Sequence, residues 1–410
     1  MMAMAARASA FWQRSGEHNV SVGASDKQLV VTHVVSGDIW AGAEAQVYQL
    51  IRALQDNKNV SPTAVLFNEG ILLQKLKAAG IPVTLADETV ESPFGLVRDL
   101  CKHFKAHQTA IVHTHGFKEN VLGTLAQKLS RVPRSVRTAH GNPESEKSWR
   151  NPKRKITSIL DRLTARYGQD AVVAVSGQLK RDLSRVYPTK TVKILNFIEI
   201  PESIEDSLTN NECASTHETV SNVIKIGLVG RLVPVKRADL FIDTIQLLKE
   251  RNSTPVTGII IGDGPLMESL KQYTEAKGKG LSDFIEFKGF VANSAQELEQ
   301  LDLLLMPSDH EGIPMVLLES LLARLPIVAH NVGGVPEILD EGRCGLLVDD
   351  HSPEGYASNV VRLLNNPALM EKFKATGRAH LLQEFNKDKN AQKYEALYRS
   401  VYYEPGRPLA

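Results

Sequence analysis

Short runs of apolar residues alternate with amphipathic stretches along most of the chain. In the first half the apolar runs lie at residues 28–35, 63–67, 82–86, 110–115, 135–140, 171–176 and 192–197. Stretches between them, such as 43–54, place apolar residues three and four positions apart, which is the spacing of a helix with one buried face. Nearly wholly apolar strands that alternate with helices indicate a parallel sheet covered on both faces.

The second half repeats this pattern. Its apolar runs lie at 223–230, 257–262, 284–289, 302–308, 326–331 and 345–350, followed by helical stretches at 353–365, 367–384 and 388–403. Ser294 and Glu297 have the spacing of a capping box that begins a helix. The pattern predicts an α/β protein with two facing, doubly wound, Rossmann-like domains and C-terminal helices. In such proteins the cleft at the carboxyl ends of the strands is the default ligand site.

The same pattern suggests where the domains begin and end. Residues 1–26 lack the apolar core of a signal peptide, and we expect a disordered leader there. We expect the first domain over 27–198, a polar linker over 199–222 and the second domain over 223–384. The last segment, 385–410, should form a helix that packs back on the first domain.

Composition narrows the class of protein. The 410 residues are 42% hydrophobic and 23% charged, as is typical of a soluble globular protein. No apolar run approaches the roughly 18 residues that a membrane-spanning helix needs. The three cysteines, Cys101, Cys213 and Cys344, have no paired spacing, which favours a reducing compartment over a disulfide framework or a zinc site.

Charge is distributed unevenly. Residues 1–200 hold 27 Lys and Arg against 17 Asp and Glu, a net charge of +10, whereas residues 201–410 hold 21 against 30, a net charge of −9. A basic half suits an anionic surface or a phosphate-bearing partner, although solvated charge without a partner explains the imbalance equally well. The basic stretch 150–166 is a candidate contact for anionic lipid headgroups, with a solvated helix face as the alternative.

Glycine and basic residues follow several of the predicted strands. After 28–35 comes SGDIWAGAE, whose Gly37 and Gly42 suit either a phosphate-binding loop or a tight turn. After 223–230 comes GRLVPVKR, in which Arg231 and Lys236 could clamp a diphosphate or form surface salt bridges. The tight turn GDGP begins at Gly262.

The segment SDHEGIPMVLLESLLARLP, residues 308–326, places Glu319 inside an otherwise apolar helix. A buried carboxylate is costly unless it is paired, so this residue needs a partner. A vicinal diol such as that of a ribose is one candidate; a structural Arg or the start of a neighbouring helix is another. Pro314 suits the first turn of the helix, and free backbone N–H groups from Gly312 to Leu317 would point toward an anion.

Four motifs occur in a fixed order: GRLVPVK, GDGP, Glu311-x7-Glu319 and NVGGVPEIL at 331–339. This ordered set resembles glycosyltransferase family 4, whose members are retaining enzymes with the two-domain GT-B fold. The resemblance covers about residues 27–403 and is strongest over 223–350. Two departures stand out: the first loop has Gly42-Ala43 in place of a glycine pair, and Asn196 is followed by Phe197 in place of glycine.

The resemblance implies a role for each matching residue. Arg231 and Lys236 would hold the donor diphosphate, Glu319 would bind the ribose, Glu311 would contact the transferred sugar, and His140 would lie near that sugar. The remaining donor contacts would come from Gly42, Gly262, Lys288, Val291, Gly312, Ile313, Pro314, Met315 and Val316. His113 and His115 end a strand on the expected acceptor side, where they would bind the acceptor or support residues that do.

These inferences give a functional expectation. The chain should transfer a hexose-type sugar, with retention, from a UDP- or GDP-sugar to a hydroxyl of a glycan, a lipid-linked saccharide or a small molecule, as in polysaccharide biosynthesis. We expect it in the cytoplasm, either free or bound peripherally to the inner face of the cell membrane, and without a nucleic-acid partner. No DxD ends an apolar strand and no cluster has metal-ligand spacing, so we expect no metal and no other cofactor.

Three alternatives share parts of this pattern. A nucleotide-sugar epimerase of the same fold would use the donor clamp without an acceptor cleft. A non-catalytic nucleotide-sugar-binding protein would not need the complete set of Arg231, Lys236, Glu311 and Glu319. A NAD-dependent dehydrogenase fits the alternating strands, but G-x-G-x-x-G is missing after the first strand.

Overall fold

The computed structural model describes residues 28–141, 152–201, 223–251, 255–278, 280–291 and 293–406. In the helix that begins at Pro152, side chains are described from Ile159 onward. The expected leader and most of the expected linker lie outside the described residues, as do Cys213 and the side chains of Lys153, Arg154 and Lys155.

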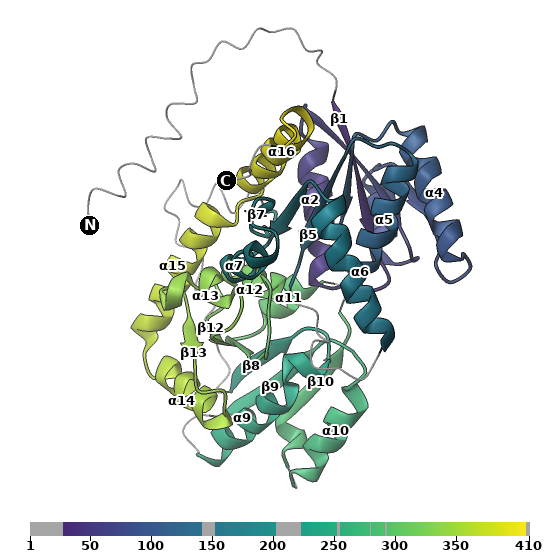
Figure 1. Ribbon diagram of the computed structural model, residues 1–410. Coiled ribbons are helices and arrows are strands. Elements are labelled where there is room, and N and C mark those ends of the chain that lie inside the picture. The colour runs from purple at the N-terminus through teal and green to yellow at the C-terminus, as the bar shows by residue number, and fades with distance from the viewer. Residues whose placement is uncertain are drawn as a thin grey trace, which may run out of the picture.

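The first domain is a seven-stranded parallel sheet in the order β3-β2-β1-β4-β5-β6-β7 (Figure 1). Its strands are β1 (Leu29–Val35), β2 (Val60–Leu66), β3 (Val83–Leu85), β4 (Ile111–Thr114), β5 (Arg134–Ala139), β6 (Ala171–Ala174) and β7 (Thr191–Lys193). The connecting helices are α2 (Gly42–Gln55), α3 (Ile71–Ala78), α4 (Pro93–Ala106), α5 (Phe117–Leu129), α6 (Pro152–Gly168) and α7 (Gly177–Val186). Neighbouring strands run parallel because a helix returns the chain after each one.

The second domain is a six-stranded parallel sheet in the order β10-β9-β8-β11-β12-β13. Its strands are β8 (Ile224–Val229), β9 (Val256–Ile261), β10 (Ile285–Gly289), β11 (Leu303–Met306), β12 (Ile327–His330) and β13 (Leu346–Val348). Its helices are α9 (Ala238–Glu250), α10 (Met267–Ala276), α11 (Ser294–Leu298), α12 (Met315–Leu322), α13 (Val335–Ile338), α14 (Pro353–Leu364) and α15 (Pro367–Glu384), with short 3-10 turns η1 (Pro234–Lys236), η2 (Ser282–Phe284) and η3 (Asp340–Gly342).

All thirteen predicted strands are present, although the last strand of the first domain is shorter than its apolar run. The run 192–197 predicts a strand to Phe197, but β7 ends at Lys193. Beyond that point the chain leaves the sheet for the second domain, where Asn196 donates from Nδ2 to the carbonyl of Ile313 at 3.1 Å. Leu195 is buried in a cluster that includes residues of the second domain, whereas Ile194 and Phe197 are buried in the first-domain cluster that α16 completes.

The predicted capping box at Ser294 is wrong. Asn293 is the N-cap residue of α11 and makes no side-chain cap hydrogen bond. The Ser294 hydroxyl donates to Glu319, and Glu297 pairs with Lys288. Both side chains have stronger partners in neighbouring elements than the start of their own five-residue helix offers, so the local motif does not form.

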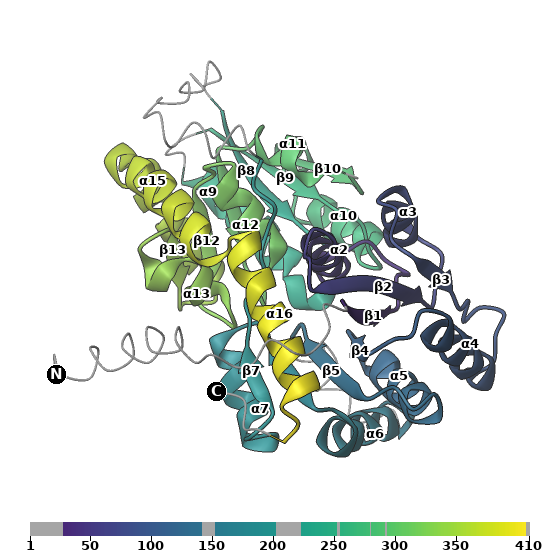
Figure 2. The same cartoon turned by 90° about the horizontal axis from the view of Figure 1, so that it is seen from above.

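The final helix, α16 (Lys387–Tyr403), lies against the first domain although the chain reaches it from the second (Figure 2). Its Tyr394 and Tyr398 are buried in a cluster with residues of β1, α2, β4 and β5. Asn57 donates to a carboxylate oxygen of Glu395 at 2.7 Å. Just before α16, a parallel bridge joins Ile198 to Asn386, so the two segments that cross between the domains lie side by side.

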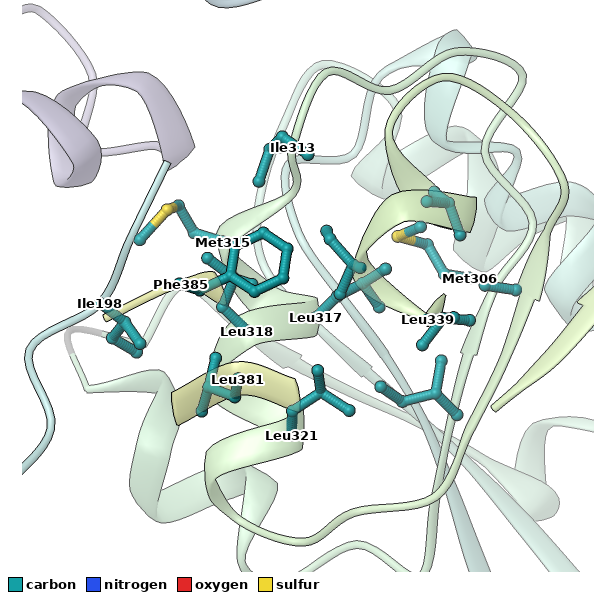
Figure 3. Packing of buried hydrophobic residues seen from close by; sticks show 14 of the residues in the cluster. Ile198, Met306, Ile313, Met315, Leu317, Leu318, Leu321, Leu339, Leu381 and Phe385 are labelled. Atoms are coloured by element: carbon teal, nitrogen blue, oxygen red, sulfur yellow. The ribbon is translucent and has the colours of Figure 1, made fainter. Parts of the chain in front are cut away.

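Helix α12 is held by apolar packing on the side away from the cavity. Leu317, Leu318 and Leu321 are buried in a cluster with Leu381 and Phe385, which the chain supplies before its return to the first domain (Figure 3). Such burial contributes about 1.5–3 kcal/mol for each large side chain. The helix that carries Glu319 therefore has a fixed position.

No helix in the described part of the chain is both long and apolar enough to cross a membrane.

Candidate active site

A cavity of about 1050 Å³ lies between the two domains. Loops at the carboxyl ends of strands in both sheets line it, as expected for doubly wound folds. Most of the predicted donor residues line it: Gly42, Arg231, Lys236, Gly262, Val291, Glu311, Gly312, Ile313, Pro314, Met315, Val316 and Glu319. Residues as far apart in sequence as Gly42 and Glu319, more than 270 positions, thus line the same cavity.

Two of the basic residues after β8 are placed to hold an anion. Arg231 is exposed to the cavity, and Lys236 ends the turn η1 at the same wall. The neighbouring Arg237 has another role, because it binds Asp239 and Asp309 at 2.8 and 3.3 Å. Arg237 also adopts a left-handed backbone with φ of 50° where α9 begins.

Glycine allows the two loops beneath these cations to interlock. A Cβ atom on Gly262, whose φ is 136°, would lie 1.9 Å from the carbonyl oxygen of Gly230. A Cβ atom on Gly264 would lie 2.5 Å from the carbonyl oxygen of Leu232. The GDGP turn therefore supports the loop that carries Arg231 and Lys236, and any side chain at Gly262 would displace that loop.

Glu311 contacts the clamp directly. One carboxylate oxygen of Glu311 lies 2.7 Å from Nζ of Lys236. The backbone of Glu311 packs closely against Gly333. A Cβ atom on Gly333, whose φ is 62°, would lie 1.8 Å from the Glu311 carbonyl oxygen. This close approach explains why the motif NVGGVPEIL has glycine at that position.

The start of α12 presents free backbone N–H groups. Pro314 is the N-cap residue, one position before the first turn that the sequence favoured for it. Among the described residues, no acceptor is found for the backbone N–H groups of Gly312, Ile313, Met315 and Val316. These donors line the cavity beside Lys236 and add to the positive potential there.

Glu319 lies one turn further into α12 and faces the same cavity. Its carboxylate accepts a hydrogen bond from the hydroxyl of Ser294 at 2.7 Å. Burial raises the pKa of the Glu319 carboxyl, while that hydrogen bond acts in the opposite direction. One hydroxyl partner leaves further acceptor positions on the carboxylate, which is what recognition of a diol requires.

The loop after β10 forms the next part of the wall through Phe290 and Val291. Lys288, which the resemblance placed here, does not line the cavity. Its ammonium group pairs with Glu297 of α11 and is only partly exposed. The exposed Phe290 ring, which the sequence analysis passed over, is the larger apolar surface at this position.

The first domain supplies the opposite wall. Gly42, at the start of α2, faces Met315, whose Cγ would lie 3.7 Å from a Cβ atom on the glycine. His140 follows β5, and its carbonyl oxygen would lie 2.0 Å from a Cβ atom on Gly312. His115 follows β4 and also lines the cavity. The two domains therefore meet through backbone at the site itself.

The prediction that His113 binds an acceptor is wrong for direct contact. Its ring has no exposed surface, and both ring nitrogens are occupied, by the Tyr398 hydroxyl and the Thr138 hydroxyl, each at 2.7 Å. His113 lies within β4, one pleat deeper than His115, and α16 covers it. Burial lowers its pKa well below the usual range.

The expectation that no cluster has metal-ligand spacing also needs correction. His33, His113 and His115 offer ligand atoms within 4.8 Å of one another. The nitrogens of His33 and His115 are only 2.9 Å apart, however, whereas two tetrahedral zinc ligands stand about 3.4 Å apart at Zn–N distances near 2.05 Å. With both nitrogens of His113 bound to hydroxyls, the group is a hydrogen-bonded histidine network.

Two residues that the sequence did not single out make contacts at the cavity or between the domains. Arg137, inside the apolar run of β5, lines the cavity, forms a buried ion pair with Asp161 at 2.9 Å and lies against the Phe117 ring. Glu337, in the fourth motif, accepts a hydrogen bond from the backbone N–H of Gly177 at 2.7 Å. Glu337 thereby joins the second domain to the start of α7. The two residues are 160 positions apart, so no local sequence pattern predicts this contact.

Comparison with known proteins identifies the family. The family model described as "Glycosyltransferase Family 4" matches residues 40–200, and that described as "Glycosyl transferases group 1" matches residues 223–366. Together the two matched regions cover more than half of the chain, one in each domain. The chain belongs to glycosyltransferase family 4.

Two curated relatives of this family-4 chain are bacterial enzymes. It is 26% identical to a UDP-Gal:alpha-D-GlcNAc-diphosphoundecaprenol alpha-1,3-galactosyltransferase of Escherichia coli, over 73% of this chain and 77% of that protein. It is 24% identical to a poly(ribitol-phosphate) alpha-N-acetylglucosaminyltransferase of Staphylococcus aureus, over 51% of this chain. The match spans 44% of the latter protein, so less than half of that longer relative is represented.

Solved structures show the same GT-B fold as this family-4 chain. The Anabaena protein HepE in complex with UDP-glucose matches with a TM-score of 0.74 and 20% identity, covering 91% of this chain and all of that one. The Staphylococcus aureus protein TarM matches with a TM-score of 0.71 and 13% identity, covering 91% of this chain and 99% of that one. The fold is therefore GT-B.

Proposed function

We propose that the protein transfers a sugar from a UDP-sugar to a hydroxyl of a glycan or lipid-linked saccharide, with retention of the anomeric configuration. The observation that carries this proposal is the convergence of Arg231, Lys236, Glu311 and Glu319 on one interdomain cavity. Family membership and relatives named for transfer to a diphosphoundecaprenol-linked sugar and to poly(ribitol-phosphate) support it.

The donor would bind to the second domain. Glu319 would accept hydrogen bonds from the ribose hydroxyls, and Arg231, Lys236 and the N–H groups before α12 would hold the diphosphate. Phe290 and Val291 would lie against the base. UDP is favoured over GDP because solved structures of the same fold contain UDP or UDP-glucose.

Chemistry would depend on electrostatics. As the sugar–phosphate bond breaks, negative charge grows on the diphosphate, where the cations and backbone donors stabilise it. Among the described residues that line the cavity we assign none as a nucleophile for the anomeric carbon, so the donor phosphate would assist deprotonation of the acceptor in a front-face displacement. Closure of the two domains would exclude water and limit hydrolysis of the donor. This scheme requires no metal ion.

The acceptor would bind to the first-domain wall, near His115, His140 and the Arg137–Phe117 pair. A lipid-linked acceptor would place the protein at the inner face of the cell membrane, with α6 toward the lipid. On α6 the exposed side chains include the apolar residues Ile159, Leu160, Leu163 and Tyr167 and the basic residues Arg162 and Arg166.

Two measurements test the proposal. A thermal-shift panel of UDP, GDP, ADP and their sugars should show stabilisation by UDP compounds, because a ligand that binds only the native state raises its melting temperature. Incubation of the stabilising UDP-sugar with a lipid-diphosphate-linked saccharide should then release UDP and extend the acceptor. Interconversion of nucleotide sugars without acceptor would favour an epimerase, and binding without any turnover would favour a non-catalytic protein.

A further inference from the structure

Three histidines form a hydrogen-bonded line from the cavity wall into the first sheet. Nε2 of His140 lies 3.2 Å from Nδ1 of His115, and Nε2 of His115 lies 2.9 Å from Nδ1 of His33. The three residues belong to neighbouring strands or their ends, because β1, β4 and β5 are adjacent in the sheet. His33 has no exposed surface, whereas His115 and His140 line the cavity.

All three rings are neutral near pH 7. Burial lowers the pKa of His33 to about 3 and that of His140 to about 4, with nearby Arg137 adding to the shift at His140. Burial, followed by the neighbouring histidines, lowers the pKa of His115 well below its usual range. A neutral imidazole carries one proton on its two nitrogens, so each ring is a donor at one end and an acceptor at the other.

Counting protons leaves two arrangements. The three rings hold three protons, and the two hydrogen bonds between them use two. The third proton lies at one end of the line, on Nε2 of His33 or on Nδ1 of His140. Both of these atoms are buried, and neither has a hydrogen-bond partner among the described residues. His113 packs beside the line with ring centroids 5.0 Å from His33 and 4.2 Å from His115, but its own nitrogens are already engaged.

The two ends differ in their surroundings. The His33 end is enclosed in the sheet, where an N–H would remain without an acceptor, and a buried donor without a partner is rarely tolerated. Nδ1 of His140 is buried as well, but His140 as a residue is partly exposed and lines the cavity, where a bound sugar can supply oxygen atoms. The lone pair therefore belongs at His33 and the proton at His140.

We propose that His115 and His33 are positioning residues that fix the tautomer of His140. His33 donates from Nδ1 to His115, His115 donates from Nδ1 to Nε2 of His140, and His140 keeps its proton on Nδ1 for an oxygen of the bound sugar or acceptor. Both the role of His140 toward a sugar and the choice of tautomer rest on the proposed function, because the sugar would supply the acceptor for the Nδ1 proton.

Nitrogen-15 spectra of the full-length, histidine-labelled protein test the tautomer. Long-range proton–nitrogen correlations distinguish the two neutral forms, and His140→Gln assigns the His140 signals. We expect a protonated Nδ1 and an unprotonated Nε2 on His140. In His115→Leu, His140 should shift toward the Nε2–H form that imidazole side chains favour in water. An Nε2–H tautomer in the unmodified protein would overturn the proposal without reference to any variant's folding.

Turnover measurements test the positioning role. His33→Leu should lower kcat about tenfold, the scale of one lost hydrogen bond, with KM for the donor unchanged. His33→Asn, whose amide can donate from the position of Nδ1, should restore most of the loss. In a His140→Ala background, His33→Leu should have no further effect on kcat. Additive losses in the double variant, with both proteins folded by circular dichroism, would contradict the proposal. If no variant and no unmodified protein turns over any UDP-sugar, the proposed function fails while the spectra still decide the tautomer.

Discussion

Nζ of Lys236 lies 2.7 Å from a carboxylate oxygen of Glu311. The side chain of Glu311 is only 8% exposed and that of Lys236 24%, so the pair is largely shielded from water. The ion pair holds both residues at the wall where the diphosphate and the sugar of a donor would meet. The Glu311 carboxylate also compensates the charge of Lys236. A donor phosphate would compete with Glu311 for this lysine, so the proposed roles of the two residues would be coupled.

Replacement of the lysine tests the clamp. Lys236→Ala should lower kcat by roughly 10²–10³-fold, the scale for loss of one electrostatic donor to a developing charge. Lys271→Ala is the matched control, since Lys271 pairs with Glu268 on the surface of α10. Initial rates of UDP release measure both variants. Unchanged turnover in Lys236→Ala would remove this residue from the mechanism.

The two glutamates should separate in a binding experiment. Glu319→Ala should weaken binding of UDP alone, because Glu319 is proposed to bind the ribose. Glu311→Ala should leave UDP affinity intact or raise it, because Lys236 is then free of its partner, and should lower turnover. Isothermal titration calorimetry with UDP decides between them. A larger loss of affinity in Glu311→Ala than in Glu319→Ala would reverse the two assignments.

Acidification should weaken nucleotide binding through Glu319. Burial raises the pKa of this carboxyl, so it becomes protonated at a higher pH than an ordinary glutamate. The protonated form is a poorer acceptor for ribose hydroxyls, so UDP affinity should fall as the pH is lowered toward 5. Glu319→Gln removes the pH dependence of UDP affinity that comes from Glu319 and retains the part that comes from the diphosphate. The difference between the titrations of the unmodified protein and the variant therefore gives the contribution of Glu319. Identical pH dependence in both proteins would mean that Glu319 does not titrate on binding.

His103 should make stability depend on pH. It is buried in α4 between the hydroxyls of Thr63 and Thr84, and burial lowers its pKa to about 4. Between pH 6.5 and about 4 the unfolded chain binds a proton at this residue and the folded chain does not. As the pH is lowered through that window, this residue should therefore reduce the free energy of unfolding by about 1.4 kcal/mol per pH unit.

His103→Gln provides the comparison. Urea unfolding of the unmodified protein and of this variant at pH 7, 6 and 5 should show a shallower decline for the variant, whatever its stability at pH 7. Parallel curves would show that the pKa of His103 in the folded state does not differ from its value in the unfolded chain.

The outer face of α6 should bind anionic membranes. Leu163 and Tyr167 are 48% and 74% exposed and lie beside the basic residues of the helix. Each cation near an anionic surface contributes on the order of 1 kcal/mol, and added salt weakens that attraction. The protein should sediment with phosphatidylserine vesicles at low salt and less at high salt.

Two variants locate this contact. Leu163→Glu should reduce sedimentation, whereas Phe94→Glu, at a still more exposed apolar residue of α4, should not. A protein that stays in the supernatant with anionic vesicles at low salt would indicate a water-soluble acceptor.

The sequence predicted the strands well because most of them are buried on both faces and so appear as nearly continuous apolar runs. The two glutamates in and before α12 could also be predicted from the sequence, since Glu311 and Glu319 contrast with their apolar neighbours. His113 was misplaced because the residue that covers it, Tyr398, lies 285 positions away in sequence. Arg137 and Glu337 were missed for the same reason: their partners belong to other elements, and only folding brings them together.

The paired segments at Ile198 and Asn386 have a mechanical consequence. Because the chain passes from the first domain to the second and returns in α16, two covalent links join the domains, and they lie side by side. A single break in one link leaves the domains tethered by the other. Because the two links are adjacent, we expect any opening or closing of the domains to turn about the region of Ile198 and Asn386, and Lys236 and His140 to move apart by rotation about that region.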